Sequence, residues 1–228
     1  MSIIKQSDQL FSFEFRQKLA PGISFPARSS IIVLENREAI IISPGPFDSQ
    51  SISEIQKLAD KFYIVAPNLF HHLHFLKAKE SFKNSELYAP KSLSKKNAKY
   101  ADQYHIIDEL PKHVKEQVKI IPINGHKALQ EWVFYHSKSQ SLVLTDLAFN
   151  MGTQGFLTAS VLKLAGAYKK LAQSRLVKST ITDKQQFHQS IWQLSKLSSR
   201  RVVLAHGDVL EDMDHWRKFL EGFKEPEA

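Results

Sequence analysis

Short runs of β-branched and apolar residues alternate with helical patterns along most of this chain, and this alternation restricts its fold more than any other feature. The runs expected to form strands are residues 31–34, 39–42, 62–66, 87–89, 119–123, 131–136, 141–144 and 201–205. Apolar residues at a spacing of three or four predict helices at residues 50–61, 69–82, 155–173, 184–198 and 212–223. Two β-rich blocks with helices around them predict an α/β fold in which two sheets are sandwiched between helices.

Turn signals separate several of these runs. Residues 35–38 (ENRE) lie between two β-branched runs and predict a hairpin. Residues 43–46 (SPGP) end the second of these strands, because proline has no N–H group to donate to a sheet. Asn68 is expected to be the N-cap of the helix at residues 69–82, because its side chain can accept bonds from free N–H groups there.

Length and composition exclude several classes of protein. A chain of 228 residues suits one domain, expected to span residues 1–228, and 43% apolar with 24% charged residues is typical of a globular protein. No uncharged apolar stretch reaches the roughly 18 residues that a membrane helix needs, and the first residues lack a secretory pattern. We therefore expect a cytoplasmic protein without a membrane partner. The absence of cysteine excludes disulfides, thiolate zinc sites and cysteine nucleophiles.

The net charge of +8 is compatible with binding to nucleic acid. However, the lysines are scattered, apart from one cluster at residues 91–99, and no basic stripe is interleaved with aromatic residues. We interpret the charge mainly as solvation of the surface and keep nucleic acid as an alternative partner.

Histidines and one aspartate follow several of the predicted strands. Strand ends that meet at one edge of a sheet can bring distant imidazoles and a carboxylate around a metal ion. Taken singly, each such histidine is more often a surface or packed residue, so the argument depends on the whole set. Neutral imidazoles with a carboxylate suit zinc, iron(II) or manganese. The candidate ligands are His71, His72, His74, His126, Asp146 and His206.

The order of these residues resembles the metallo-β-lactamase fold, whose motifs run HxHxDH, Gly-His, an Asp after a strand and a late His. The matching stretches are INGHKALQEWVFYH around His126, SLVLTDLAF around Asp146 and RVVLAHGDV around His206. The spacing between His126 and Asp146, with a hairpin expected between them, is also similar to the spacing in that family. The resemblance covers about residues 30–215 and implies a four-layered αββα sandwich.

The first motif departs from the family pattern. The family's Asp-x-Gly turn is replaced by residues 43–45 (SPG), without the acid. In one register His72 and His74 are the paired histidines of HxH, and Leu76 and Lys77 stand where Asp and His belong.

A second register of the motif begins directly after the strand at residues 62–66. It places Pro67 and Leu69 at the HxH positions, His71 at the Asp and His72 at the last His. We favour this register because it preserves the usual length of the following helix, and we keep the first as an alternative.

The resemblance implies a metal-dependent hydrolase that acts on a small molecule of unspecified identity. Asp146 would be the catalytic residue, orienting a metal-bound water or accepting its proton. The loss of two ligands argues for one divalent ion rather than two. The alternative is a non-catalytic descendant of the fold without metal, with a binding or structural role and an association with nucleic acid. Serine hydrolase chemistry at Ser43 is not expected, since no histidine lies near it in the sequence.

Overall fold

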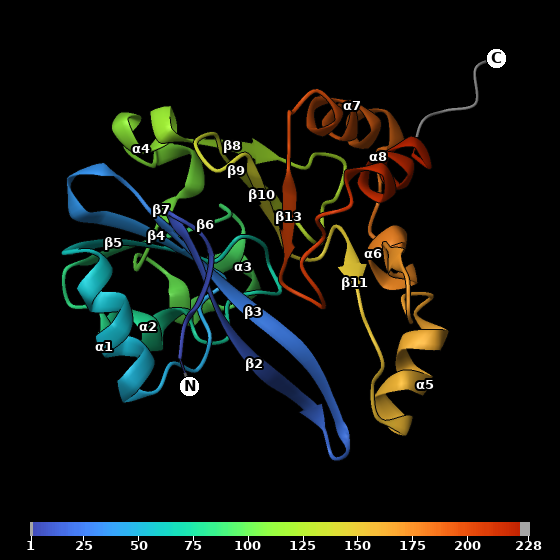
Figure 1. The fold of residues 1–228 in the computed structure, drawn as a ribbon, viewed down its shortest axis with the longest axis horizontal. Helices are drawn as coiled ribbons and strands as arrows, with labels where there is room; N and C mark the ends of the chain where they lie inside the picture. The colour runs from blue at the N-terminus through green and yellow to red at the C-terminus, as the bar shows by residue number, and fades with distance from the viewer. Residues whose placement is uncertain (1, 224–228) are drawn as a thin grey trace.

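Two mixed β-sheets pack face to face in the computed structural model, which describes residues 2–223 (Figure 1). Within these residues the first sheet has seven strands in chain order: β1 (Ile4–Ser7), β2 (Leu10–Ala20), β3 (Ile23–Val33), β4 (Glu38–Ile42), β5 (Lys61–Val65), β6 (Ser85–Ala89) and β7 (His105–Ile106). Strands β1 to β4 pair antiparallel, and β4 to β7 pair parallel.

The second sheet has the strand order β13-β10-β9-β8 among the described residues. Its strands are β8 (Val118–Pro122), β9 (Trp132–His136), β10 (Ser141–Leu144) and β13 (Arg201–Leu204). Only β10 and β13 pair parallel in this sheet, so their carboxyl ends meet at the same edge. A separate two-stranded ribbon joins β11 (Phe149–Asn150) to β12 (Leu171–Ala172).

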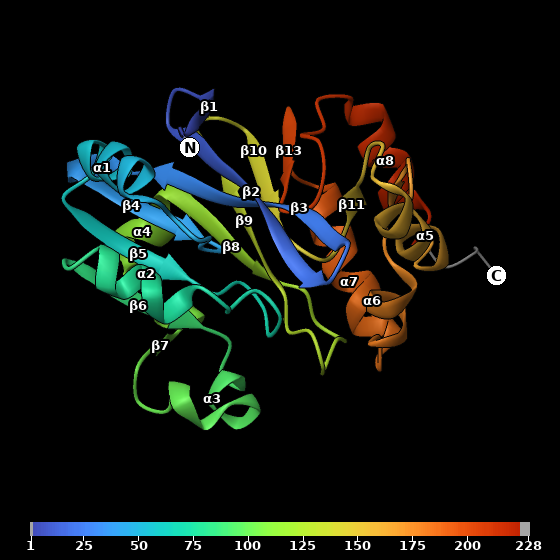
Figure 2. The same ribbon diagram turned by 90° about the horizontal axis from the view of Figure 1, so that it is seen from below.

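Helices cover the outer faces of both sheets (Figures 1 and 2). The first sheet is covered by α1 (Ser49–Leu58) and α2 (Phe75–Ser81), and the second by α7 (Lys184–Ser195) and α8 (Met213–Glu221). The remaining helices are α3 (Leu93–Lys96), α4 (Lys112–Gln117), α5 (Phe156–Leu164) and α6 (Arg175–Ser179), with 3-10 turns at Glu35–Arg37, Ala98–Tyr100 and Ile107–Glu109. No helix within residues 2–223 is long and apolar enough to cross a membrane.

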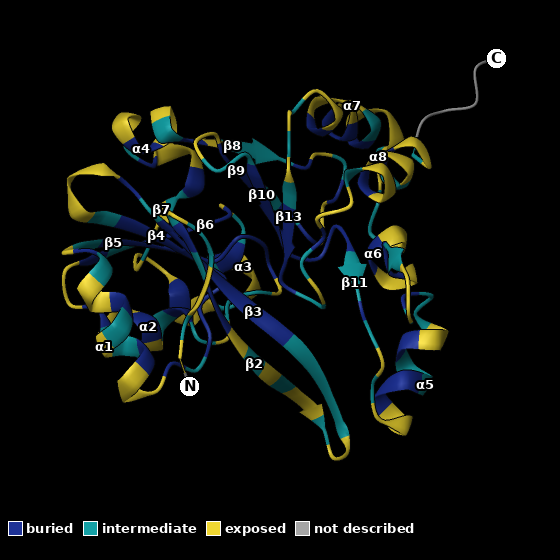
Figure 3. Ribbon diagram, viewed as in Figure 1, coloured by how far each residue is buried: buried dark blue, intermediate teal, exposed yellow. Residues whose placement is uncertain are grey.

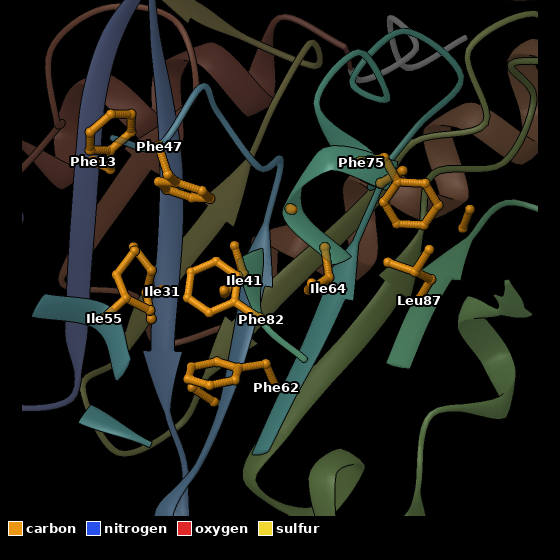
Figure 4. Packing of buried hydrophobic residues seen from close by; sticks show 14 of the residues in the cluster. Phe13, Ile31, Ile41, Phe47, Ile55, Phe62, Ile64, Phe75, Phe82 and Leu87 are labelled. Carbon is orange, nitrogen blue, oxygen red and sulfur yellow. The ribbon is translucent and has the colours of Figure 1, made fainter. Parts of the chain in front are cut away.

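The alternation of side chains along each strand explains the four layers. In β4, Ala39 and Ile41 face the helices, whereas Ile40 and Ile42 face the second sheet. The outer cluster of the first sheet contains many aromatic rings (Figure 4). Strands β4, β5 and β6 are mostly buried, whereas the β2–β3 hairpin is partly exposed toward its tip (Figure 3). The arrangement confirms the expected αββα sandwich.

Two predicted helices are wrong in extent. Residues 69–74 form turns, and α2 begins only at Phe75. The Asn68 side chain does cap this segment, because its Oδ1 accepts bonds from the N–H groups of Phe70 and His71. The helix expected over residues 155–173 ends at Leu164, since Gly166 with a φ of 73° turns the chain back toward β12.

Candidate metal centre

Three side chains from distant parts of the chain form a compact group: His71, Asp146 and His206. One ligand atom from each lies within 4.8 Å of the others. The two Nε2 atoms are 3.1 Å apart, and His71 Nε2 lies 3.2 Å from Asp146 Oδ2. His206 Nε2 lies 3.7 Å from Asp146 Oδ1. The structure therefore brings together three of the six predicted ligands.

Parallel strands position two members of this group. Leu144 of β10 pairs with Leu204 of β13, and Asp146 and His206 each follow two residues later. His71 arrives from the first sheet, in the turns that follow β5. The group thus lies where the carboxyl ends of strands from both sheets meet.

The His206 ring is held in a defined orientation. Its Nδ1 donates to the Pro26 carbonyl at 3.0 Å, and its ring stacks on Phe149 with centroids 5.1 Å apart. Because Nδ1 carries the proton of the neutral ring, Nε2 presents its lone pair to the group.

Ser43 holds the His71 ring in the same way. Its Oγ lies 2.6 Å from His71 Nδ1. With a proton on Nδ1, the ring donates a hydrogen bond to this hydroxyl, and Nε2 faces the group. Ser43 has a φ of 55°, an unfavourable conformation for a residue other than glycine. No histidine lies near Ser43 in the sequence. The parallel pairing of β4 with β5 supplies one, because the residues after both strands meet in space.

Asp146 is fixed through both its side chain and its backbone. Its Oδ2 accepts a bond from Asn68 Nδ2 at 2.7 Å, and its backbone N–H donates to Glu131 Oε2 at 3.0 Å. Glu131 also accepts from the backbone N–H and the hydroxyl of Thr145, at 2.7 and 3.0 Å. Burial and the nearby Asp146 carboxylate raise the pKa of Glu131 to about 7.

The pKa values of the three residues shift in different directions. Burial alone would raise the pKa of Asp146, but the adjacent His71 lowers it to about 2. Burial opposes ionisation of His71 as well, yet the Asp146 carboxylate raises the pKa of His71 above its usual value. Burial and the neighbouring His71 together lower the pKa of His206 to about 4. The arrangement thus favours one positive charge beside the Asp146 carboxylate.

The donor atoms fit a single divalent ion. Two imidazole lone pairs at 3.1 Å repel each other unless a proton or a metal ion lies between them. Zinc–nitrogen bonds of about 2.0–2.1 Å in a tetrahedron place ligand atoms roughly 3.3 Å apart. The distances of 3.1 Å between the two Nε2 atoms and 3.2 Å from His71 Nε2 to Asp146 Oδ2 are close to this value, and His206 Nε2 lies 3.7 Å from the other carboxylate oxygen, Oδ1. Two imidazoles and one carboxylate suit zinc, iron(II) or manganese.

The other three predicted ligands lie outside the group. His72 Nδ1 bonds to the Tyr100 hydroxyl at 2.8 Å, and His74 Nε2 bonds to Gln17 Oε1 at 3.1 Å. The turns at residues 69–74 direct these rings away from His71.

His126 is held at a different place, beside α7. Its Nδ1 bonds to Thr180 Oγ1 at 2.9 Å, and its ring packs on Phe187. Gly125 has a φ of 81° and approaches α7 so closely that an added Cβ would lie 2.2 Å from the Asp183 carbonyl oxygen. This close approach fixes His126 away from His71, Asp146 and His206.

Ser43, Asn68 and Glu131 also belong to the site, although the sequence did not predict them there. Asn68 was expected only as a helix cap, and Glu131 only as the start of a strand. The available signal was position, because all three polar residues border β-branched or apolar runs. Their partners lie 14 to 78 residues away along the chain, which a local pattern does not reveal.

Comparisons with known proteins are consistent with this architecture. No protein-family model matches the sequence, and no curated protein matches it. Solved structures do match over nearly the whole chain. A metallo-β-lactamase from Pontibacter korlensis has a TM-score of 0.64 at 15% identity, covering 96% of this chain and 98% of its own.

Two further neighbours give the same result. A metallo-β-lactamase from Hirschia baltica has a TM-score of 0.62 at 9% identity, covering 100% of this chain and 99% of its own. The metallo-β-lactamase FIM-1 from Pseudomonas aeruginosa, in a mono-zinc form, has a TM-score of 0.63 at 12% identity, covering 97% and 95%. The chain therefore has a metallo-β-lactamase-like α/β fold with two mixed sheets flanked by helices. Identities this low show the fold alone.

Proposed function

We propose that this chain is a metal-dependent hydrolase with one divalent ion held by His71, Asp146 and His206. The observation that carries the proposal is the pair of Nε2 atoms 3.1 Å apart beside a buried carboxylate. Both rings use Nδ1 for other bonds, so each offers a lone pair to the same point. The mono-zinc form of FIM-1 supports the use of one ion in this fold.

The residues of the chain divide the proposed chemistry between them. A bound divalent ion would lower the pKa of a water molecule and polarise a carbonyl or phosphoryl oxygen. Ser43 and the Pro26 carbonyl keep the two rings in their binding orientation. Asn68 donates to Asp146 Oδ2 and holds the carboxylate in place, so that Oδ2, beside His71 Nε2, would bind the ion and Oδ1 would orient water or accept its proton.

A cavity of about 490 Å³ lies beside the chain around His206 and is the proposed place for the substrate. Its lining includes Arg16, Arg28, Gly152, Gln154, Ala205 and Gly207, and the last two flank His206. The His71 and His206 side chains are only 12% and 11% exposed and do not line the cavity themselves, so the wall beside Ala205 and Gly207 is the proposed route to the ion. Several of the solved neighbours are metallo-β-lactamases, which makes amide hydrolysis one class of reaction to test.

A second candidate function is a metal-free binding or structural role. The raised pKa of His71 favours it, because a proton on His71 Nε2 would also remove the repulsion with His206. In that case the group would be a buried ionic network without hydrolytic activity.

Activity of metal-reconstituted protein tests the proposal against this alternative. Untagged protein is freed of metal with a chelator, supplied with zinc, iron(II) or manganese, and assayed on an activated carboxyl ester, a phosphodiester and a β-lactam. We expect hydrolysis that requires an ion and disappears in the His206→Ala variant. The His72→Ala variant is the matched control and keeps its activity. Equal rates for wild type and His206→Ala with every ion would contradict the proposal.

A further inference from the structure

Large apolar side chains are exposed on α5, on α6 and at the tip of the β2–β3 hairpin. Phe156 is 85% exposed, Leu164 74% and Leu176 65%, and Leu19 and Leu157 are 58% and 50% exposed. We call these five residues the apolar patch. Exposed apolar clusters of this kind mark surfaces that bind a partner.

The sequence of α5 gives it a second apolar face. At 100° per residue, Phe156, Leu157 and Leu164 lie within about 100° of one another on the helix surface. Thr158, Ala159 and Leu162 are buried on the opposite side of the helix. The buried face of α5 packs against the rest of the protein. The apolar residues on its outward face have no such packing role.

Direct contacts hold the parts of the patch together. Thr158 Oγ1 bonds to the backbone N and O of Ser24, at 3.3 Å each, near the tip of the hairpin. The Leu157 side chain lies so close to Gly22 that an added Cβ would be 2.6 Å away. The backbone N–H of Arg175 in α6 donates to the Ala165 carbonyl at 2.8 Å. The hairpin tip and α5 lie together at one side of the molecule, with exposed stretches on both (Figures 1 and 3).

The two segments of the chain that carry the patch contain basic residues and no acidic ones. Residues 147–182 contain five basic residues and no acidic one, and residues 15–34 contain three basic residues and no acidic one. The basic residues near the patch are exposed: Lys18, Lys163, Lys169, Lys170, Arg175 and Lys178. A surface that combines exposed phenylalanine and leucine with positive charge is complementary to a layer with an apolar interior and anionic headgroups.

We propose that this face of the molecule docks onto an anionic lipid surface. Phe156, Leu164 and the other patch residues enter the boundary of the headgroup layer, and the surrounding lysines and Arg175 bind the headgroups. The proposal differs from the expectation of no membrane partner, which depended on the lack of a spanning segment. Docking on a surface requires no such segment. It is also independent of the proposed metal site.

Two other occupants fit the observations less well. A second copy of the chain related by a twofold axis would bring the same basic residues against each other. A nucleic acid would use the positive charge, but leucines do not stack on bases, and four of the five patch residues are leucines. An anionic lipid surface uses both the charge and the leucines.

Co-sedimentation of the full chain with vesicles tests the proposal. We expect binding to vesicles of phosphatidylcholine with phosphatidylserine and much weaker binding to phosphatidylcholine alone. A Phe156→Ser and Leu164→Ser double variant keeps the charge and lowers binding at least about tenfold. Replacing Lys169 and Lys170 by Gln keeps the apolar side chains and lowers binding about fivefold for each lysine. Because all four side chains are exposed, these variants fold, which circular dichroism checks.

Matched surface variants serve as controls. Trp192→Ser removes an apolar side chain that is 60% exposed on α7, outside the patch, and leaves binding unchanged. The Lys57→Gln and Lys112→Gln double variant removes two exposed charges elsewhere and also leaves binding unchanged. Equal changes in the patch variants and the controls would overturn the assignment of this face.

Three further results would overturn the proposal. The first is no binding to the anionic vesicles, or equal binding to both kinds of vesicle. The second is salt-sensitive binding to a DNA or RNA oligonucleotide without binding to lipid, which would assign the face to nucleic acid. The third is a concentration-dependent dimer that the Phe156→Ser and Leu164→Ser double variant abolishes, which would assign the face to a second copy.

Discussion

At the scale of single residues, the site depends on partners that fix the outer nitrogens of two imidazole rings. Ser43 accepts from His71 Nδ1, and the Pro26 carbonyl accepts from His206 Nδ1. Without these partners either ring could rotate or change its tautomer, and the two Nε2 lone pairs would no longer converge. The orienting groups are therefore as important to the site as the ligand atoms.

Glu131 tests whether a buried carboxylate organises the loop that carries Asp146. Its side chain accepts three bonds from Thr145 and Asp146, and the residue is 1% exposed. In Glu131→Gln an NH₂ group replaces one carboxylate oxygen. It then faces an N–H or O–H donor of Thr145 or Asp146, so at least one hydrogen bond is lost. We expect this variant to lower the free energy of unfolding by about 1–3 kcal/mol in urea denaturation. Glu116→Gln, at a side chain that is 62% exposed, should change it by less than about 0.5 kcal/mol.

The burial of His126 should make the free energy of unfolding depend on pH. Burial lowers the pKa of His126 to about 4, from an ordinary value of 6.5. Below pH 6.5 the unfolded chain therefore binds a proton that the folded chain rejects, and stability falls as the pH falls toward 4. Between pH 7 and pH 5 this residue should account for about 2 kcal/mol of lost stability.

Urea denaturation at several pH values measures this contribution. The His126→Gln variant should lose about 2 kcal/mol less than wild type between pH 7 and pH 5. An unchanged pH dependence in His126→Gln would show that the buried ring does not titrate as described.

At the scale of elements, two parallel strand pairs position the residues of the site: β10 with β13, and β4 with β5. Each pair ends at the same edge of its sheet, so the residues that follow meet without long loops. The ribbon strand β11 then packs against the chain after β13, where the Asn150 N–H donates to the His206 carbonyl at 3.1 Å. Asp146 and His206 are thus held near each other by the pairing of β10 with β13 before them and by the bond between β11 and the His206 backbone after Asp146.

Gly207 makes this close packing of β11 possible. Its φ is 98°, and an added Cβ would lie 2.1 Å from the Asn150 carbonyl oxygen. Gly207→Ala should cost about 2 kcal/mol or more in unfolding free energy and weaken metal binding through the displaced His206. Gly155→Ala adds a Cβ with no atom within 4 Å and should change stability far less. Similar unfolding curves for the two variants would contradict this packing.

At the scale of the whole molecule, the order of motifs was sufficient to predict the αββα sandwich. Strand patterns that end in an acid or a histidine also pointed to Asp146 and His206. The sequence favoured the register with His71 and His72 and left the one with His72 and His74 open, because the choice between them depends on the turns that Asn68 imposes. His126 was predicted as a ligand but lies outside this group, because Gly125 packs closely against the start of α7.

Metal binding should stabilise the entire fold, since the ligands come from both sheets. An ion at about 100 times its dissociation constant adds about 2.7 kcal/mol. For a chain of this size that raises the melting temperature by roughly 5–10 °C. Thermal melts with and without zinc or manganese measure the shift. The His206→Ala variant should show no shift, and an equal shift in that variant would place the ion elsewhere.

The most direct test of the central claim is the metal content of untagged protein, measured by elemental analysis after metal supplementation and removal of free ions. We predict about one divalent ion per chain in wild type, in His72→Ala and in His126→Ala. Loss of the ion is predicted for His71→Ala, Asp146→Ala and His206→Ala. Wild-type protein that holds no stoichiometric ion, or an ion that survives the loss of His71 and His206, would contradict the account.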